Sequence, residues 1–137
     1  MPSPLNSRYA FHAYLIAAGA GLITLYWGGL QNLWQRWSVQ PEYSHGFLIP
    51  LVAAYVFWER RSEWMPALGS ASWRGPILLS VALVLLLIGE ISALYILIHY
   101  SLLLALLALA STTIAQAQRS AFIPIAFLAF AIPLPYF

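Results

Sequence analysis

The sequence predicts an all-α protein: a polytopic membrane helix bundle of about five spans, with a short interfacial helix after the first span. Two observations lead to this fold class. Of the 137 residues, 62% are hydrophobic and only 7% are charged, whereas a soluble domain carries about 25% charged residues. The apolar residues also fall into long runs separated by short polar segments. A chain of this composition cannot cover its surface with polar groups, so we expect an integral membrane protein.

The expected spans follow the apolar runs. A transmembrane helix needs about 20 mainly apolar residues, and residues 10–30, 76–96 and 98–117 each meet that length. The last two ranges form one double-length run without a Gly–Pro pair to mark its turn, so the length argument places the turn within Ser92–Ser101. Residues 44–58 are shorter, which leaves a full span and a re-entrant segment as alternatives for this second segment.

The last apolar segment, residues 121–137, is expected to be a fifth span that is unfinished. It contains Pro124, Pro133 and Pro135, and it reaches Phe137 without a polar stop. Proline bends or ends a helix because it lacks an N–H group and clashes with the preceding turn. The pattern therefore predicts a span that is not completed within residues 1–137.

A polar stretch, residues 31–43, separates the first two apolar runs. Its tryptophans are typical of a membrane–water interface, where the apolar ring and the polar N–H are both accommodated. Leu30, Leu33, Trp34 and Trp37 follow the i, i+3, i+4, i+7 spacing of an amphipathic helix. The pattern predicts a short helix lying on the membrane surface.

The basic residues set the expected orientation. All six are arginines: Arg8, Arg36, Arg60, Arg61, Arg74 and Arg119. Three of them share the loop between the second and third segments, and cytoplasmic loops are the ones enriched in Lys and Arg. This places the N-terminus in the cytoplasm and Arg36, with residues 42–45, on the outer face of a plasma (inner) membrane. Five of the six arginines agree with this multi-pass arrangement.

The first candidate site is the polar cluster before the second apolar run: Glu42, Tyr43, Ser44, His45 and Gly46. A histidine near an interface can exchange protons near neutral pH. Ser44 and His45 are not expected to form a nucleophile–base pair, because neighbouring residues on a helix point in different directions. The structural alternative is that Ser44 caps the second helix while His45 packs at the interface.

Glu90 is the second candidate, because it lies inside an apolar run. An ionisable group there costs about 2.5–3.5 kcal/mol on insertion scales, so it normally faces protein or a water cavity and has a partner. The candidate partners on the same side are Arg36, His45, His99 and Tyr100. A protonated, hydrogen-bonded structural carboxyl group and a functional group remain open alternatives.

Other functional classes find no support in the sequence. The chain has no cysteine, which excludes disulfides, thiolate metal sites and thiol nucleophiles within it. A histidine–glutamate metal site would need a third ligand, so we expect neither a metal nor another cofactor. The net charge of +2 is small and dispersed, unlike the blocks of like charge that bind nucleic acid.

The stretch from Glu42 to Arg61 resembles the N-terminal signature of the exosortase/archaeosortase family. It has a polar lead-in, then Ser-His-Gly-Phe-Leu-Ile-Pro, an apolar stretch and Trp-Glu-Arg-Arg. Gly89-Glu90, the double-length apolar run and Ile-Pro-Leu-Pro at 132–135 also fit this family. The resemblance implies a membrane cysteine protease/transpeptidase. Its partners are the lipid bilayer and surface proteins with a C-terminal signal: a Pro-Glu-Pro-like motif, a membrane helix and an arginine cluster.

The resemblance does not carry catalytic residues into this chain. The family's cysteine nucleophile has no counterpart here, and His45 matches only the signature histidine. We therefore expect an N-terminal fragment that is inactive alone and whose intact form processes and sorts surface proteins. The alternative is a small membrane transport or scaffold subunit that uses Glu90 with His45 or His99. The third alternative is a helix bundle that has only a structural role.

Overall fold

The computed structural model describes residues 4–64, 73–113 and 122–132, and within these ranges the chain is helical apart from short turns. The expected all-α membrane helix bundle is therefore confirmed. The elements are α1 (Pro4–Leu25), α2 (Trp27–Val39), the 3₁₀ helix η1 (Pro41–Phe47), α3 (Leu48–Glu59), α4 (Arg61–Trp64), α5 (Arg74–Ser92), α6 (Tyr95–Thr113), α7 (Ile123–Phe127) and the 3₁₀ helix η4 (Leu128–Ala131).

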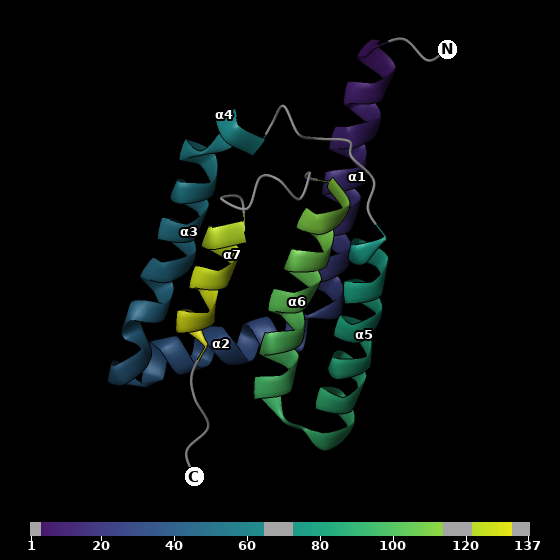
Figure 1. The fold of residues 1–137 in the computed structure, drawn as a ribbon. Helices are drawn as coiled ribbons and strands as arrows, with labels where there is room; N and C mark the ends of the chain where they lie inside the picture. The colour runs from purple at the N-terminus through teal and green to yellow at the C-terminus, as the bar shows by residue number, and fades with distance from the viewer. Residues whose placement is uncertain (1–3, 65–72, 114–121, 133–137) are drawn as a thin grey trace.

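The helices form an upright bundle with one element lying across its end. Helices α1, α3, α5, α6 and α7 run roughly alongside one another, and α2 runs crosswise near the lower part of the bundle (Figure 1). The start of α1 and helix α4 lie at the upper end in this view, whereas α2 and the α5–α6 turn lie at the lower end. The bundle thus has two distinct ends, which we call the α4 end and the α2 end.

Helix α2 corresponds to the short surface helix that the polar stretch predicts. It begins at Trp27, earlier than the polar stretch, and its axis is bent by 69° from that of α1. It ends at Val39, and Gln40 is extended, with φ −100° and ψ 111°. This conformation follows from Pro41, because a proline disfavours helical geometry in the residue before it. Helix α1 ends at Leu25, so the expected first span, residues 10–30, includes the bend and the start of α2.

The expected spans 98–117 and 121–137 lie partly outside the described residues, because residues 114–121 and 133–137 are not among them. Two helices, Arg74–Ser92 and Tyr95–Thr112, are long and apolar enough to cross a membrane, and a third is counted if the bent α1–α2 pair is one span. Helix α3 has 12 residues and α7 has 5. At 1.5 Å per residue, α3 is roughly 18 Å long, which is short of the ~30 Å hydrocarbon core.

Helices α5 and α6 form a tight antiparallel hairpin. The chain turns at Ala93, which lies within the range expected from length and adopts a left-handed conformation with φ 54°. The Leu94 N–H donates to the Gly89 carbonyl at 3.0 Å, which satisfies a carbonyl that the helix end leaves free. Gly89 is buried against Ile98 at this turn, so the absence of a side chain lets the two helices approach closely.

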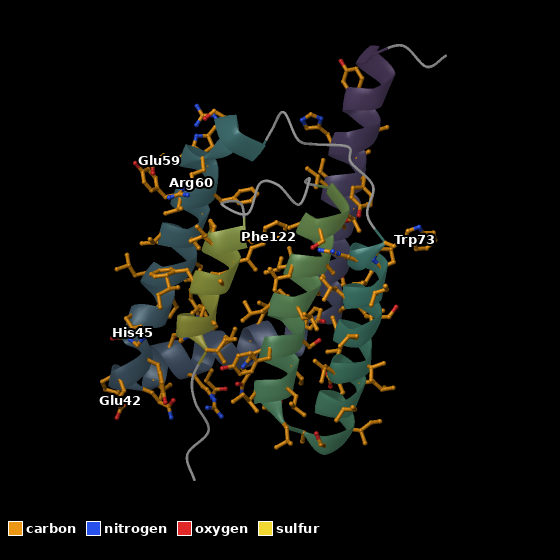
Figure 2. All side chains as sticks on the ribbon, viewed as in Figure 1. Glu42, His45, Glu59, Arg60, Trp73 and Phe122 are labelled. Carbon is orange, nitrogen blue, oxygen red and sulfur yellow. The ribbon has the colours of Figure 1, made fainter. Side chains whose placement is uncertain are left out.

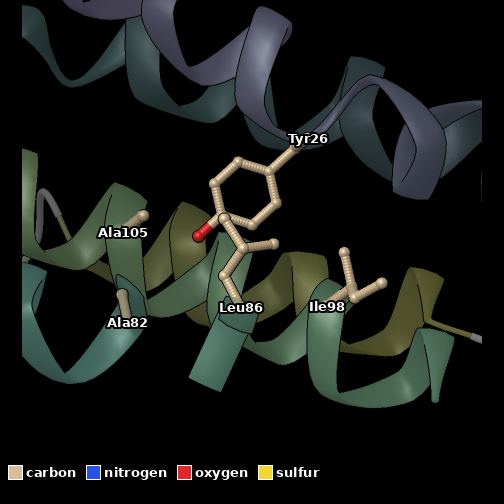
Figure 3. Packing of buried hydrophobic residues seen from close by; sticks show 5 residues of the cluster. All are labelled: Tyr26, Ala82, Leu86, Ile98 and Ala105. Carbon is tan, nitrogen blue, oxygen red and sulfur yellow. The ribbon is translucent and has the colours of Figure 1, made fainter. Parts of the chain in front are cut away.

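The hydrophobic core joins this hairpin to the bend between α1 and α2. Tyr26 is only 1% exposed and packs with Ala82, Leu86, Ile98 and Ala105 (Figure 3). These residues come from the bend, α5 and α6. The bend is therefore packed against the α5–α6 hairpin.

A buried hydrogen-bond chain holds the same junction. Ser101 Oγ donates to the Ala82 carbonyl at 2.6 Å, and it lies 2.6 Å from Tyr26 Oη. A serine hydroxyl has one proton, and the bond to Ala82 uses it. The Tyr26 hydroxyl must then be the donor to Ser101 Oγ, so the direction of the whole chain is set.

Candidate functional site

The polar cluster that the sequence singles out forms η1, between α2 and α3. Figure 2 shows Glu42 and His45 at the α2 end of the molecule. Glu42, Ser44 and His45 are exposed, Tyr43 is half-buried and Gly46 is buried. The 3₁₀ turn thus presents a carboxylate, a hydroxyl and an imidazole on the surface.

Ser44 does not cap the second helix, so this structural alternative is wrong. Its hydroxyl donates to the Pro41 carbonyl at 2.9 Å, within η1 itself. Helix α3 begins at Leu48, its N-cap position is Phe47, and no side chain caps it. The physical reason is that the chain is already turning as a 3₁₀ helix at Ser44, where a hydroxyl can reach back to the carbonyl three residues earlier.

Gly46 lies directly against the indole ring of Trp37 on α2. A side chain at position 46 would overlap the indole nitrogen and its neighbouring carbons. Phe47 packs edge-on against the rings of Trp34 and Trp37, with centroid distances of 4.9 Å and 5.4 Å, and such edge-to-face pairs are favourable. The Gly46–Phe47 step therefore positions η1, and with it His45, on α2.

Trp37 also connects this element to the last described helical segment. Its Nε1–H donates to the carbonyl of Ala131 at 2.8 Å, across 94 positions of sequence. Ala131 is the last residue of η4 and is 5% exposed. The sequence predicts an interfacial tryptophan at Trp37. A buried indole N–H does need an acceptor, but the pattern does not reveal which carbonyl supplies it.

The arginine-rich end of α3 lies away from η1. Figure 2 places Glu59 and Arg60 at the opposite end of α3 from His45. There the Arg61 guanidinium lies over the Trp58 ring, 4.6 Å from its centroid, and donates to the Trp58 carbonyl at 3.0 Å. The polar cluster and these arginines therefore occupy opposite ends of the bundle. The orientation expected from the arginine count places them on opposite sides of the membrane, which requires such a separation.

Glu90 and His99 are not brought together with the polar cluster. Glu90 is exposed on α5, and its carboxylate makes no side-chain hydrogen bond or ion pair with another described residue. His99 is 3% exposed, and its Nε2 lies 2.9 Å from the Gly29 carbonyl. A carbonyl oxygen can only accept, so Nε2 carries the proton. The expected partner for Glu90 is thus absent from the described part of the chain, and His99 instead ties α6 to α2.

The fold and this site define a polytopic helical membrane protein that displays a polar 3₁₀ turn at one end of its bundle. Residues 34–137 match the family of transmembrane exosortases, and the chain belongs to that family. The match begins within α2 and covers η1 and α3, so it includes the whole Glu42–Arg61 stretch. The family resemblance is confirmed. Comparisons with curated proteins and with solved structures find no match.

Proposed function

We propose that this chain is the N-terminal membrane region of an exosortase-like protease/transpeptidase. The intact enzyme would cleave surface proteins near a C-terminal sorting signal on the outer face of the plasma membrane and transfer or release them. The observation that carries this proposal is the family match over residues 34–137. The geometry supports it, because η1 presents polar groups at one end of an otherwise apolar bundle.

We assign residues 1–137 a supporting role at the outer-facing catalytic site of the intact enzyme. A thiolate nucleophile attacks a peptide carbonyl once a neighbouring cation or base has activated it, and this chain contains no cysteine. The residues described here therefore supply no nucleophile, and residues 1–137 are expected to be inactive alone. His45, Glu42 and Ser44 would border the outer-facing site. Trp37 and Gly46 would hold them in place.

The first test is the coding sequence beyond Phe137. The proposal expects an in-frame cysteine in a polar, outer-facing context, followed by arginine-bearing spans. A natural stop codon after Phe137, in a protein that still functions, would reject the protease assignment.

The second test uses cells that make the intact protein together with a secreted reporter. The reporter carries a Pro-Glu-Pro-like motif, a membrane helix and an arginine cluster at its C-terminus. We expect a shortened, released reporter, less of it with His45→Ala, and wild-type amounts with Glu59→Gln at the other end of α3. An unprocessed reporter at wild-type protein levels would contradict the proposal.

No observation favours the transport alternative over this proposal. A polar path would bring Glu90 together with His45 or His99, but His99 Nε2 is already bonded to the Gly29 carbonyl. Glu90→Gln is expected to leave ion flux unchanged, and a change in flux without any change in reporter length would favour a transport subunit instead.

A further inference from the structure

The apolar surface of α3 is short and has exposed polar groups at both ends. Glu59 ends the helix on the side of α4, and His45 lies in η1 at the α2 end (Figure 2). The chain rises about 1.5 Å per residue in an α-helix and about 2.0 Å in a 3₁₀ helix, so His45 and Glu59 are at most about 23 Å apart along it. The large exposed side chains between them are apolar or aromatic: Leu48, Leu51, Val52, Tyr55 and Trp58.

Helix α5 has an apolar surface of nearly the same length. Arg74 is its first residue and Glu90 lies near its end, and both side chains are exposed. At 1.5 Å per residue, these two residues are roughly 24 Å apart. The large exposed side chains between them are aliphatic: Ile77, Leu79, Val81, Leu83, Val84, Leu87 and Ile88.

Glu90 belongs to the same end of the bundle as the polar turn η1. The side chain of Ile98 packs against both Gly29 of α2 and Gly89 of α5, because a Cβ atom at either glycine would lie 2.7 Å from it. Gly89 directly precedes Glu90, and α2 leads through Gln40 into η1. The apolar surfaces of α3 and α5 therefore both end in exposed polar groups at the α2 end.

We propose that the bilayer is locally thinned around α3 and α5, so that outer water reaches η1 and Glu90. The hydrocarbon core of a typical bilayer is about 30 Å thick, roughly 6 Å more than either apolar surface. Arginine can reach the interface along its long stem, but glutamate and histidine have shorter side chains. A hydrophobic surface that is too short is accommodated by thinning of the bilayer. This inference is independent of the proposed protease function.

The first test measures stability against bilayer thickness. The protein is reconstituted in phosphatidylcholine vesicles with myristoleoyl, oleoyl or erucoyl chains, and unfolding by denaturant is followed by circular dichroism. A mismatch of about 6 Å costs a fraction of a kcal/mol per Å, so we expect a roughly tenfold larger ratio of folded to unfolded protein in the myristoleoyl vesicles than in the oleoyl ones. A ratio that is equal in these two lipids, or larger in oleoyl vesicles, would overturn the proposal.

A pair of variants at Glu90 separates apolar length from charge. Glu90→Leu extends the apolar surface of α5 to Ser92, a further ~3 Å, and should lower the preference for myristoleoyl chains to roughly fivefold. Glu90→Gln removes the charge but keeps a polar group, and should retain the tenfold preference. An unchanged preference in Glu90→Leu, or an equal loss in both variants, would contradict the proposal.

Spin labels locate the two water boundaries directly. Single labels are attached to Ser44→Cys in η1, Ser62→Cys in α4 and Leu51→Cys in α3, three positions that are exposed. In oleoyl vesicles, the labels at positions 44 and 62 should collide mainly with a water-soluble nickel chelate, and the label at position 51 mainly with oxygen. A label at position 44 or 62 that collides mainly with oxygen would show that this end lies in hydrocarbon of ordinary thickness, and would reject local thinning.

Discussion

The indole N–H of Trp37 donates to the carbonyl of Ala131 at 2.8 Å, and this bond joins α2 to the end of η4 across 94 residues. The same indole ring lies directly against Gly46. One side chain therefore contacts both the polar 3₁₀ turn and the segment that leads into residues 133–137. Trp37 thus links the turn that carries His45 to that segment.

Replacing Trp37 by phenylalanine should weaken this junction. Trp37→Phe keeps an aromatic ring for Phe47 but removes the donor, and an unsatisfied buried carbonyl costs about 1–3 kcal/mol. Trp34→Phe is the control, because Trp34 also packs against Phe47 but is 64% exposed. Denaturant unfolding in micelles measures both variants. Equal stability of the two would show that the Ala131 contact contributes nothing.

Gly46→Ala should destabilise the protein, because the new methyl group would overlap the Trp37 ring. Overpacking of this kind costs about 1–3 kcal/mol. Gly28→Ala is the matched control, since a methyl group there has no other atom within 4 Å and alanine is the better helix former. The melting temperatures should therefore move in opposite directions, and a fall of the same size in both variants would refute the Gly46–Trp37 packing.

The buried chain from Tyr26 to Ala82 predicts an order of effects. Tyr26→Phe removes one donor and leaves the Ser101–Ala82 bond intact, at a cost of about 0.5–1.5 kcal/mol. Ser101→Ala leaves the Tyr26 hydroxyl buried without its acceptor, which should cost more, about 1–3 kcal/mol. Unfolding free energies of the two variants decide the point. A larger loss for Tyr26→Phe would mean that the assigned direction of the chain is wrong.

Ala93→Gly should stabilise the α5–α6 hairpin. Ala93 has a left-handed backbone conformation, which costs a residue with a Cβ atom roughly 1–2 kcal/mol and glycine far less. Ala17→Gly in the exposed part of α1 should have the opposite sign and destabilise by about 1 kcal/mol. Thermal unfolding followed by circular dichroism compares them, and a lower melting temperature for Ala93→Gly would argue against this turn geometry.

Much of the fold could be predicted because the bilayer constrains it. The hairpin of α5 and α6 follows from one apolar run of double length, and its turn at Ala93 lies where length places it. Helix α2 follows from the spacing of Leu33, Trp34 and Trp37. These features depend on local pattern and on the thickness of the hydrocarbon core.

The parts that could not be predicted depend on long-range contacts. Nothing in the neighbouring sequence indicates that the Trp37 indole donates a hydrogen bond to the Ala131 carbonyl, or that His99 bonds to the Gly29 carbonyl. The interpretation of Ser44 as a helix cap did not foresee that η1 is a separate 3₁₀ turn. No local signal identifies a partner for Glu90 either, and among the described residues the structure shows its carboxylate exposed.

The central claim is that η1 faces the exterior while the arginines at the α4 end face the cytoplasm. The chain has no cysteine, so a single introduced thiol reports its own location, and Ser38 and Ser62 are both exposed. A membrane-impermeant maleimide applied to intact cells should label Ser38→Cys and should label Ser62→Cys only after permeabilisation. The reverse pattern would invert the topology and contradict the account of an outer-facing exosortase-like site.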